Sequence, residues 1–326
     1  MMQNSHKATL VVDLGGTKII TAVVFPDGSV VSRNYCLTLA NEGPEAVINR
    51  MLSGIDDVLA KTRIKISNLC GLGIAAAGII DTTNGVIKTS PNLPGWRDIP
   101  LRDILANELG IDVYIINDAS AAALGEHRFG AGKGIDNLIY LTVSTGIGGG
   151  IIVGGELYLG SDGCAGELGH MTIESQGPKC NCGNSGCLEV LASGTAMAKE
   201  AKRRLGQGEA SSILTLVDGR PRDITAKTVA MAAKQGDALA CEVVARTANY
   251  LGIGLANLIN IFNPDVIVIG GGVSKMGEML LKPARKVAKK RAFRMPTQTV
   301  RILRAYLGDN AGIIGAAAYI FECNQV

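Results

Sequence analysis

The stretch that decides the fold is residues 8–31, which read ATLVVDLGGTKIITAVVFPDGSVV. An apolar run ends at Asp13, a glycine-rich turn follows at 13–18, and a second apolar run reaches a Pro-Asp-Gly-Ser turn. This order predicts three antiparallel strands joined by tight turns. Residues 137–159, NLIYLTVSTGIGGGIIVGGELYL, repeat the order around a second glycine-rich turn at 144–150. The repeat predicts duplicated domains, and ligands often bind in a cleft between two such halves.

Helical periodicity alternates with short apolar strands in the rest of the chain, which is typical of the α/β class. Residues 207–223 are polar and irregular, and no chemistry is assigned to them. We expect one helix to begin at Pro44 and others to span 100–109, 119–129, 195–205 (ended by Gly206), 237–262 and 277–291, with a last helix after 308–312 that runs to Phe321. We expect buried strands within 69–80, 113–116, 266–269 and 299–305.

Composition excludes several classes of protein. The chain has 326 residues, enough for two domains, and a net charge of +3 without a basic block, so we expect no nucleic-acid partner. No apolar stretch reaches the length of a membrane span, so we expect no membrane partner. The segment Met1–Lys7 is short and polar, which does not fit a signal peptide. Eight cysteines spread through an ordinary chain favour a cytoplasmic location.

A cluster of cysteines lies in Glu167–Glu189, which reads ELGHMTIESQGPKCNCGNSGCLE. Three thiolates, from Cys180, Cys182 and Cys187, and the imidazole of His170 would complete a tetrahedral shell for zinc. The alternatives are a free-thiol cluster or a disulfide, but a Cys-x-Cys disulfide is strained. Four protein ligands leave no open position on the metal, which favours a structural zinc.

Three glycine-rich turns, at 13–18, 144–150 and 270–274, allow backbone N–H groups to approach an anion closely. Each turn alone is more often only a turn, but together they suit a polyphosphate. The chain has no Gly-x-x-x-x-Gly-Lys-Ser/Thr motif, so it is not a P-loop protein. Further donors in the turns come from Thr17, Lys18 and Thr145.

Asn117 and Asp118 end an expected strand and open a helix. An ordinary helix N-cap is the alternative to a functional role for this pair. Glu167 and Glu189 at the ends of the cysteine cluster could be surface charges. A metal would fix both carboxylates, and fixed carboxylates and amides suit a polyhydroxylated ligand. If one ring nitrogen of His170 binds zinc, the other remains a directional donor.

These motifs resemble the ROK family of sugar kinases and sugar-responsive repressors over nearly the whole chain. Asp13–Lys18 and Ser144–Gly150 resemble its two phosphate motifs, and Asn263–Gly272 resembles its adenosine-side turn. Glu-x-Gly-His followed by Cys-x-Cys-Gly-x-x-Gly-Cys-x-Glu, at 167–189, is its zinc and sugar signature and the most specific match. Asn92–Trp96 with Asn117-Asp118 is most similar to the glucokinases of the family.

The resemblance implies a two-domain actin-like/ribonuclease H-like fold of the hexokinase superfamily, with a cleft between duplicated α/β domains. We expect an N-terminal lobe of residues 1–118, rejoined by 308–326, and a C-terminal lobe of residues 119–307 that carries the zinc motif.

The resemblance also implies an ATP-dependent kinase that phosphorylates the 6-hydroxyl of a hexose, D-glucose first, with Asp118 as general base. ATP, Mg²⁺ and a structural Zn²⁺ would be bound, the zinc by His170, Cys180, Cys182 and Cys187. The hexose would contact Asn92, Asn117, Asp118, Glu167, His170 and Glu189. ATP with Mg²⁺ would lie against Asp13, Gly15, Gly16, Thr17, Lys18, Thr145, Gly146, Gly271 and Gly272.

Several alternatives stay open. The sugar could be N-acetylmannosamine, fructose or allose, and Ala77, which departs from the usual family pattern, bears on that choice. A second departure is Ser144, where many members have glycine. The repressors of the family carry an N-terminal helix-turn-helix domain, and the first expected strand begins near Ala8, which disfavours that class. A sugar-binding protein without catalysis is the last alternative. Family members are often dimers or tetramers, so we expect a homo-oligomer.

Overall fold

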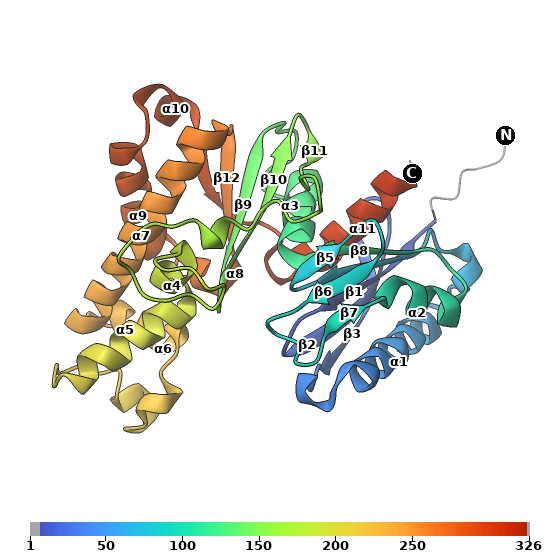
Figure 1. Ribbon diagram of the computed structural model, residues 1–326, viewed down its shortest axis with the longest axis horizontal. Helices are drawn as coiled ribbons and strands as arrows, with labels where there is room; N and C mark the ends of the chain where they lie inside the picture. The colour runs from blue at the N-terminus through green and yellow to red at the C-terminus, as the bar shows by residue number, and fades with distance from the viewer. Residues whose placement is uncertain (1–6, 325–326) are drawn as a thin grey trace. The chain divides into compact units, whose positions relative to one another are not determined.

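The structure of the protein is a computed structural model that describes residues 7–324 (Figure 1). The chain forms two compact units, each described here by itself. Unit 1 contains the residues up to Asp136, residues 150–166 and the residues from Tyr306 onward, and unit 2 contains residues 137–149 and 167–305. Of the segment Met1–Lys7, all but Lys7 lies outside the described residues. Among the helices of residues 7–324, none is both long enough and apolar enough to span a bilayer.

Unit 1 is built on a five-stranded mixed sheet with the strand order β3-β2-β1-β4-β8. Its strands are β1 (Thr9–Leu14), β2 (Lys18–Val24), β3 (Val30–Leu37), β4 (Leu72–Ala76) and β8 (Val113–Asn117). β2 pairs antiparallel with both β1 and β3, whereas β4 pairs parallel with β1 and β8. The three antiparallel strands expected at the start of the chain are therefore confirmed.

The central strands of this sheet are apolar on both faces, because helices cover both faces. On one face, Leu10, Val12 and Leu14 pack in a core with residues of α1 (Pro44–Thr62) and α2 (Leu101–Leu109). On the other face, Val11 packs in a core with residues of α3 (Asp118–Phe129) and α11 (Ala311–Cys323). A small second sheet, β5 (Ile79–Asp81), β6 (Val86–Thr89) and β7 (Arg97–Ile99), completes unit 1.

Helix α3 belongs to unit 1, whereas we expected the lobes to meet at 118/119. The reason is close packing between α3 and α11. A Cβ at Gly315 would lie 1.6 Å from the carbonyl oxygen of Ala121, and one at Gly125 would lie 2.7 Å from that of Ala311. Only glycine allows two helix backbones to approach so closely, so α3 stays with the helix that closes unit 1.

Unit 2 holds most of a second mixed sheet, whose strand order is β11-β10-β9-β12-β13. Its strands are β9 (Leu138–Val143), β10 (Ile147–Val153, with 150–153 in unit 1), β11 (Glu156–Leu157, in unit 1), β12 (Val266–Gly270) and β13 (Arg301–Arg304). The expected repeat of the opening is confirmed, although its third strand, β11, has only two residues. Every residue of β12 is buried between parallel neighbours β9 and β13.

The helices of unit 2 surround α7 (Ala238–Phe262), which contacts α4, α5, α6 and α9. The others are α4 (Leu188–Ala192), α5 (Gly194–Gly206), α6 (Ala226–Lys234), α8 (Gly271–Ser274), α9 (Glu278–Arg291) and α10 (Arg294–Thr299). The sequence did not predict α4, α6, α8 or α10. α6 begins at a reciprocal cap between Thr225 and Thr228, a pair that lacks the usual Glu or Gln partner. α10 ends at Thr299, so β13 starts two residues later than expected.

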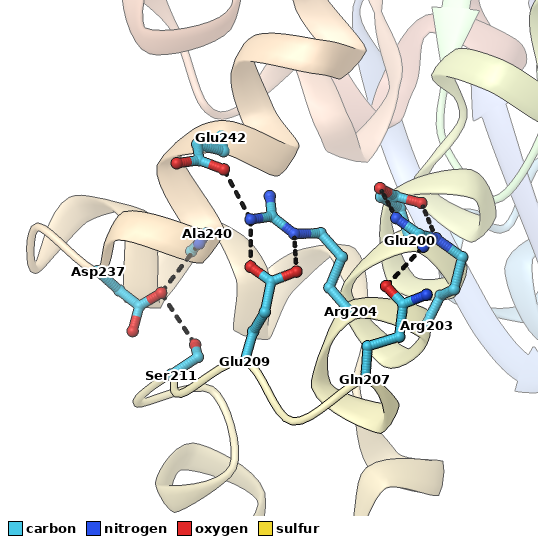
Figure 2. A network of polar contacts seen from close by, with 9 residues as sticks. All are labelled: Glu200, Arg203, Arg204, Gln207, Glu209, Ser211, Asp237, Ala240 and Glu242. Atoms are coloured by element: carbon cyan, nitrogen blue, oxygen red, sulfur yellow. Dashed lines mark hydrogen bonds and ion pairs between the residues drawn. The ribbon is translucent and has the colours of Figure 1, made fainter.

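Residues 207–212, for which no chemistry was predicted, are held by a polar network (Figure 2). Arg204 of α5 donates to Glu209 over 2.8 Å and pairs with Glu242 of α7 over 2.7 Å. Asp237 caps α7 by accepting from the N–H of Ala240 at 2.9 Å, and it also accepts from Ser211 and from the N–H of Ser212, at 2.9 and 2.7 Å. One carboxylate therefore joins the start of α7 to the loop after α5.

We predict that Asp237→Ala lowers the free energy of unfolding by about 2 kcal/mol, because a helix cap and three further hydrogen bonds, from Ser211 and Ser212, are lost together. Burial works against ionisation of Asp237, but the hydrogen bonds from Ala240, Ser212 and Ser211 hold its pKa below the ordinary value. A lowered pKa adds stability above the unfolded-state pKa and loses it as the pH falls through the folded-state pKa. The difference between wild type and variant, measured by urea unfolding, should therefore shrink in acid.

The matched control is Asp218→Asn, which neutralises an exposed acid in the same loop region and suits its left-handed φ of +49°. An Asp237→Ala variant no less stable than this control would contradict the role of the cap.

Candidate functional site

His170, Cys180, Cys182 and Cys187 come together in unit 2, and their ligand atoms all lie within 4.8 Å of one another. Cys180 Sγ lies 3.6 Å from His170 Nδ1, and Cys182 Sγ lies 3.7 Å from Cys187 Sγ. Ligands about 2.3 Å from a tetrahedral zinc lie roughly 3.8 Å apart, so the spacing fits that ion. A disulfide, at about 2.05 Å between sulfurs, does not fit, and all eight cysteines are free.

The cysteine loop reaches this geometry through tight backbone turns. Gly186 has a φ of +66°, and a Cβ there would lie 1.6 Å from the carbonyl oxygen of Glu174, so the position requires glycine. Asn184 was missed in the sequence. Its amide lies 3.6 Å from Cys187 Sγ and donates to Thr172 Oγ1 over 2.8 Å. In the sequence, only its position between Cys182 and Cys187 could have indicated this role.

The pKa values of the three thiols are shifted in different directions. Burial raises the pKa of Cys187 to about 12 and raises that of Cys180, whereas the N–H of Asn184 lowers the pKa of Cys182. Zinc is bound by thiolates and stabilises them strongly. Cys180 and Cys187 are buried and Cys182 is exposed, and a metal ion would hold all three thiols in the charged form.

Both ends of Glu167–Glu189 contact the turn between β9 and β10. Glu189 Oε2 accepts a hydrogen bond from the N–H of Ile147 at 2.9 Å, and a Cβ at Gly146 would lie 2.3 Å from that oxygen. A Cβ at Gly169 would lie 1.9 Å from the carbonyl oxygen of Ile147. The structure thus unites the second glycine turn with the cysteine loop, which the sequence showed as separate motifs.

Glu167 lies beside His170 on the side away from the sulfur atoms. Its Oε2 is 3.7 Å from His170 Nε2, while His170 Nδ1 faces Cys180. The two ring nitrogens therefore face different partners, as expected for a histidine that binds metal through one nitrogen and directs the other outward. Both residues stand at the 3-10 helix Leu168–His170, so the same turn positions the imidazole and the carboxylate.

The second and third glycine turns meet beside the start of α5. The N–H of Gly194 donates to the carbonyl oxygen of Ser144 at 2.7 Å, and Thr195 Oγ1 donates to that of Thr145 at 2.8 Å. Gly271, at a φ of +81°, lies against β9, because a Cβ there would be 2.4 Å from the carbonyl oxygen of Val143. Thr145, Gly146, Gly271 and Gly272 of the expected nucleotide site therefore belong to one region of unit 2.

The first glycine turn belongs to unit 1. The N–H of Gly15 donates to the carbonyl oxygen of Lys18 at 3.0 Å, and Thr38 Oγ1 donates to that of Gly15 at 2.6 Å. A Cβ at Gly16 would lie 2.7 Å from the Cβ of Asn92. Asn92 is therefore packed against this turn, a contact between segments 76 positions apart that the sequence could not indicate.

Asp13 and Asp118 lie at the same edge of the first sheet. In the parallel register Leu14 pairs with Ala76 and Ala76 with Asn117, so β1 and β8 end side by side with β4. Burial, with a further contribution from the charge of Asp118, raises the pKa of Asp13 to about 6, although Lys18 acts in the opposite direction. Burial also raises the pKa of Asp118, against a hydrogen bond from the N–H of Ala119.

Asn117 is the N-cap of α3, as the structural alternative proposed. Its Oδ1 accepts from the N–H groups of Ala119 and Ser120, at 2.9 and 3.2 Å, and its Nδ2 donates to the carbonyl oxygen of Gly78 at 3.1 Å. Capping and a ligand contact are compatible, because an amide nitrogen carries two protons. Asp118 is the first helical residue, so the cap fixes the residue beside it.

Comparisons with known proteins agree with these motifs. The model of the ROK family matches residues 9–322. The glucokinase of Thermotoga maritima is 40% identical over 316 residues, which cover 95% of this chain and 96% of that protein. The crystal structure of a ROK family glucokinase from Streptomyces griseus in complex with glucose and AMPPNP superposes with a TM-score of 0.84 at 36% identity, covering 96% and 98% of the two chains.

A sugar-responsive repressor is also similar. The xylose repressor of Caldicellulosiruptor bescii is 35% identical over 297 residues, which cover 90% of this chain and 73% of that protein. The expected actin-like fold of the hexokinase superfamily is confirmed by the likeness to ROK structures, which share the two five-stranded mixed sheets. With a family model that matches nearly the whole chain, and relatives of both kinds at these identities, the protein belongs to the ROK family.

Proposed function

We propose that the protein transfers the γ-phosphoryl group of ATP to the 6-hydroxyl of a hexose, with D-glucose as the first substrate to test. The observation that carries the proposal is Asp118, a carboxyl of raised pKa at the first position of α3. The similarity to glucokinases and to a structure that contains glucose and AMPPNP supports the same activity.

Asp118 would act as the general base. A hydroxyl that attacks phosphorus must lose its proton, and a carboxylate made more basic by desolvation accepts it more readily than an exposed one. The cap by Asn117 orients the residue, and the hydrogen bond from the N–H of Ala119 to Asp118 Oδ1, at 2.8 Å, occupies one oxygen. The other oxygen, Oδ2, would then face the sugar.

The remaining side chains would bind and orient the two substrates. We assign the hexose hydroxyls to Asn92 and Asn117 of unit 1 and to Glu167, His170 and Glu189 of unit 2. We assign the nucleotide to the glycine turns, namely Asp13, Gly15, Gly16, Thr17, Lys18, Thr145, Gly146, Gly271 and Gly272. Mg²⁺ bound with ATP would neutralise phosphate charge, and phosphoryl transfer asks the protein mainly for positioning and charge compensation.

Zinc in the His170, Cys180, Cys182 and Cys187 cluster would be structural. Four protein ligands leave no position for a substrate. The metal would fix the loop whose two ends contact Ile147, and thereby the carboxylates of Glu167 and Glu189.

A sugar-responsive repressor is the second candidate, favoured by the identity with the xylose repressor. The two functions differ in one measurable respect, because only the kinase consumes ATP when sugar is added.

We predict that a coupled assay with ATP and Mg²⁺ detects phosphorylation of glucose above mannose, fructose, N-acetylmannosamine and N-acetylglucosamine. Asp118→Asn should lower kcat roughly 10²–10⁴-fold, because a general base is removed. Binding of glucose to this variant, measured by calorimetry, should largely survive. Asp112→Asn, an exposed acid just before β8, is the control. Full activity of Asp118→Asn would exclude the base assignment, and turnover of another sugar alone would redirect the substrate assignment.

We predict that Asp13→Asn stabilises the ligand-free protein at neutral pH by about 3 kcal/mol, because the pKa of Asp13 rises from 3.8 to about 6 on folding. A raised pKa adds stability below the unfolded-state pKa and loses it as the pH rises through the folded-state pKa. The gain of the variant should therefore be absent near pH 3 and complete above pH ~7.

Urea unfolding at several pH values measures this gain. The control is Asp56→Asn, at an exposed position of α1. An equal response of both variants to pH would mean that the environment of Asp13 does not disfavour its charge.

We predict one zinc per chain by elemental analysis. Cys182→Ser should lose the metal and weaken glucose binding roughly tenfold, because the loop that holds Glu167 and Glu189 loosens. Limited proteolysis should then cut within residues 171–186. Cys241→Ser, an exposed cysteine of α7 outside the cluster, is the control. Zinc-free protein that binds glucose as tightly as the wild type would refute the scaffold role.

A further inference from the structure

Glu126 is a fully buried acid near the end of α3, with 0% of its surface exposed, and the mechanism above does not use it. Its Oε2 accepts from the N–H groups of Ala131 and Tyr306, at 2.8 and 3.1 Å, and its Oε1 accepts from that of Leu307 at 2.7 Å. Charged side chains are almost never buried without partners. Here the partners are three backbone donors from two distant parts of the chain.

These donors lie near two of the four places where the chain passes between the units, at 136/137 and 305/306. Ala131 follows α3 in the segment that leaves unit 1 at 136/137, and Tyr306 is the first residue after the chain returns at 305/306. The outgoing segment is itself folded, because the N–H of Gly132 donates to the carbonyl oxygen of Glu126 at 2.9 Å and that of Ile135 to Gly132 at 3.1 Å. One carboxylate therefore joins the outgoing and the returning segments.

Gly130 makes room for this arrangement. A Cβ at that position would lie 2.1 Å from Glu126 Oε2, so the carboxylate occupies the space that any other residue would fill. The backbone of Gly130 is not left-handed, with a φ of −117°, and the glycine is required by close approach alone. Glu126 provides the acceptor oxygens and Gly130 leaves space for them, so both residues specify the same contact.

Helix α3 connects this contact to the proposed base. Asp118 is the first residue of α3, and Glu126 follows it after two turns, a rise of about 12 Å. The helix is fixed against α11 through Gly125 and Gly315. The hydrogen bonds that hold the two segments to Glu126 therefore also fix the position of these segments relative to Asp118.

We propose that Glu126 is a positioning residue. It fixes both segments to the helix that carries Asp118, so that near the crossings at 136/137 and 305/306 the chain bends only at residues other than Ala131, Tyr306 and Leu307. Its effect on turnover rests on the proposed kinase function, whereas its effect on the segments does not.

The test is hydrogen exchange followed by mass spectrometry on the ligand-free full chain. Glu126→Gln keeps one acceptor oxygen and turns an NH₂ group toward at least one N–H, and Glu126→Ala removes all three contacts. In both variants, peptides that cover 129–135 and 305–309 should exchange about tenfold faster or more, while the rest of α3 and α11 is unchanged. The matched control is Arg128→Gln, which breaks the ion pair with Glu322 between the same two helices.

Measurement of kcat and of hexose affinity separates a positioning role of Glu126 from a purely structural one. Glu126→Gln should lower kcat about tenfold, with hexose affinity within about twofold of the wild type, because the ground-state contacts to the sugar remain. Three results would overturn the proposal. The first is faster exchange throughout α3, and the second is exchange equal to that of the Arg128→Gln control. The third is an unchanged kcat in a variant whose two segments exchange faster.

If both Glu126 variants fail to fold, Gly130→Ala provides a second route, because its Cβ displaces the carboxylate. It should give the same local pattern of exchange, and unchanged exchange in 305–309 would overturn the proposal. A wild type that phosphorylates no hexose would refute the proposed function alone, since the exchange pattern by itself decides whether Glu126 holds the two segments.

Discussion

Parallel pairing of β4 with β1 and β8 is the constraint on which unit 1 depends. Because parallel strands end at one edge, this pairing brings Asp13, near the end of β1, to the same edge as Asp118, which opens α3. Both faces of the strands are covered by apolar side chains, so water can reach these carboxyls from few directions. Their raised pKa values follow from that enclosure. The basicity proposed for Asp118 therefore depends on its place at the edge of the covered sheet as much as on the residue itself.

Unit 2 obtains its functional geometry from a different source. Its cysteine loop has little regular structure, and its shape depends on turns at glycine, on hydrogen bonds such as those of Asn184, and on the proposed metal. The loop returns at both ends to Ile147. The turn before β10 and the cysteine loop support each other, so neither the backbone proposed to bind phosphate nor the carboxylates proposed to bind sugar would depend on a flexible segment.

The sequence predicted the features that follow from local pattern. Alternating apolar runs with Gly and Pro turns indicated the strands and their repeat, and ligand spacing indicated the metal cluster. It missed α6 because the cap formed by Thr225 and Thr228 is not the usual pair. It could not indicate that Asn92 packs on Gly16 or that Glu126 is buried, because both contacts join segments far apart in the chain. The roles assigned to individual site residues remain predictions.

The cover of the first sheet by α11 has a consequence for synthesis of the protein. One face of β1 and β4 is buried by residues such as Ile313 and Ala317, which are translated about 300 positions later. A ribosome makes roughly 5–20 residues per second, so this apolar face stays uncovered for tens of seconds while unit 2 is made. The core of unit 1 is therefore completed only when α11 has been made, and until then its uncovered apolar face is open to aggregation.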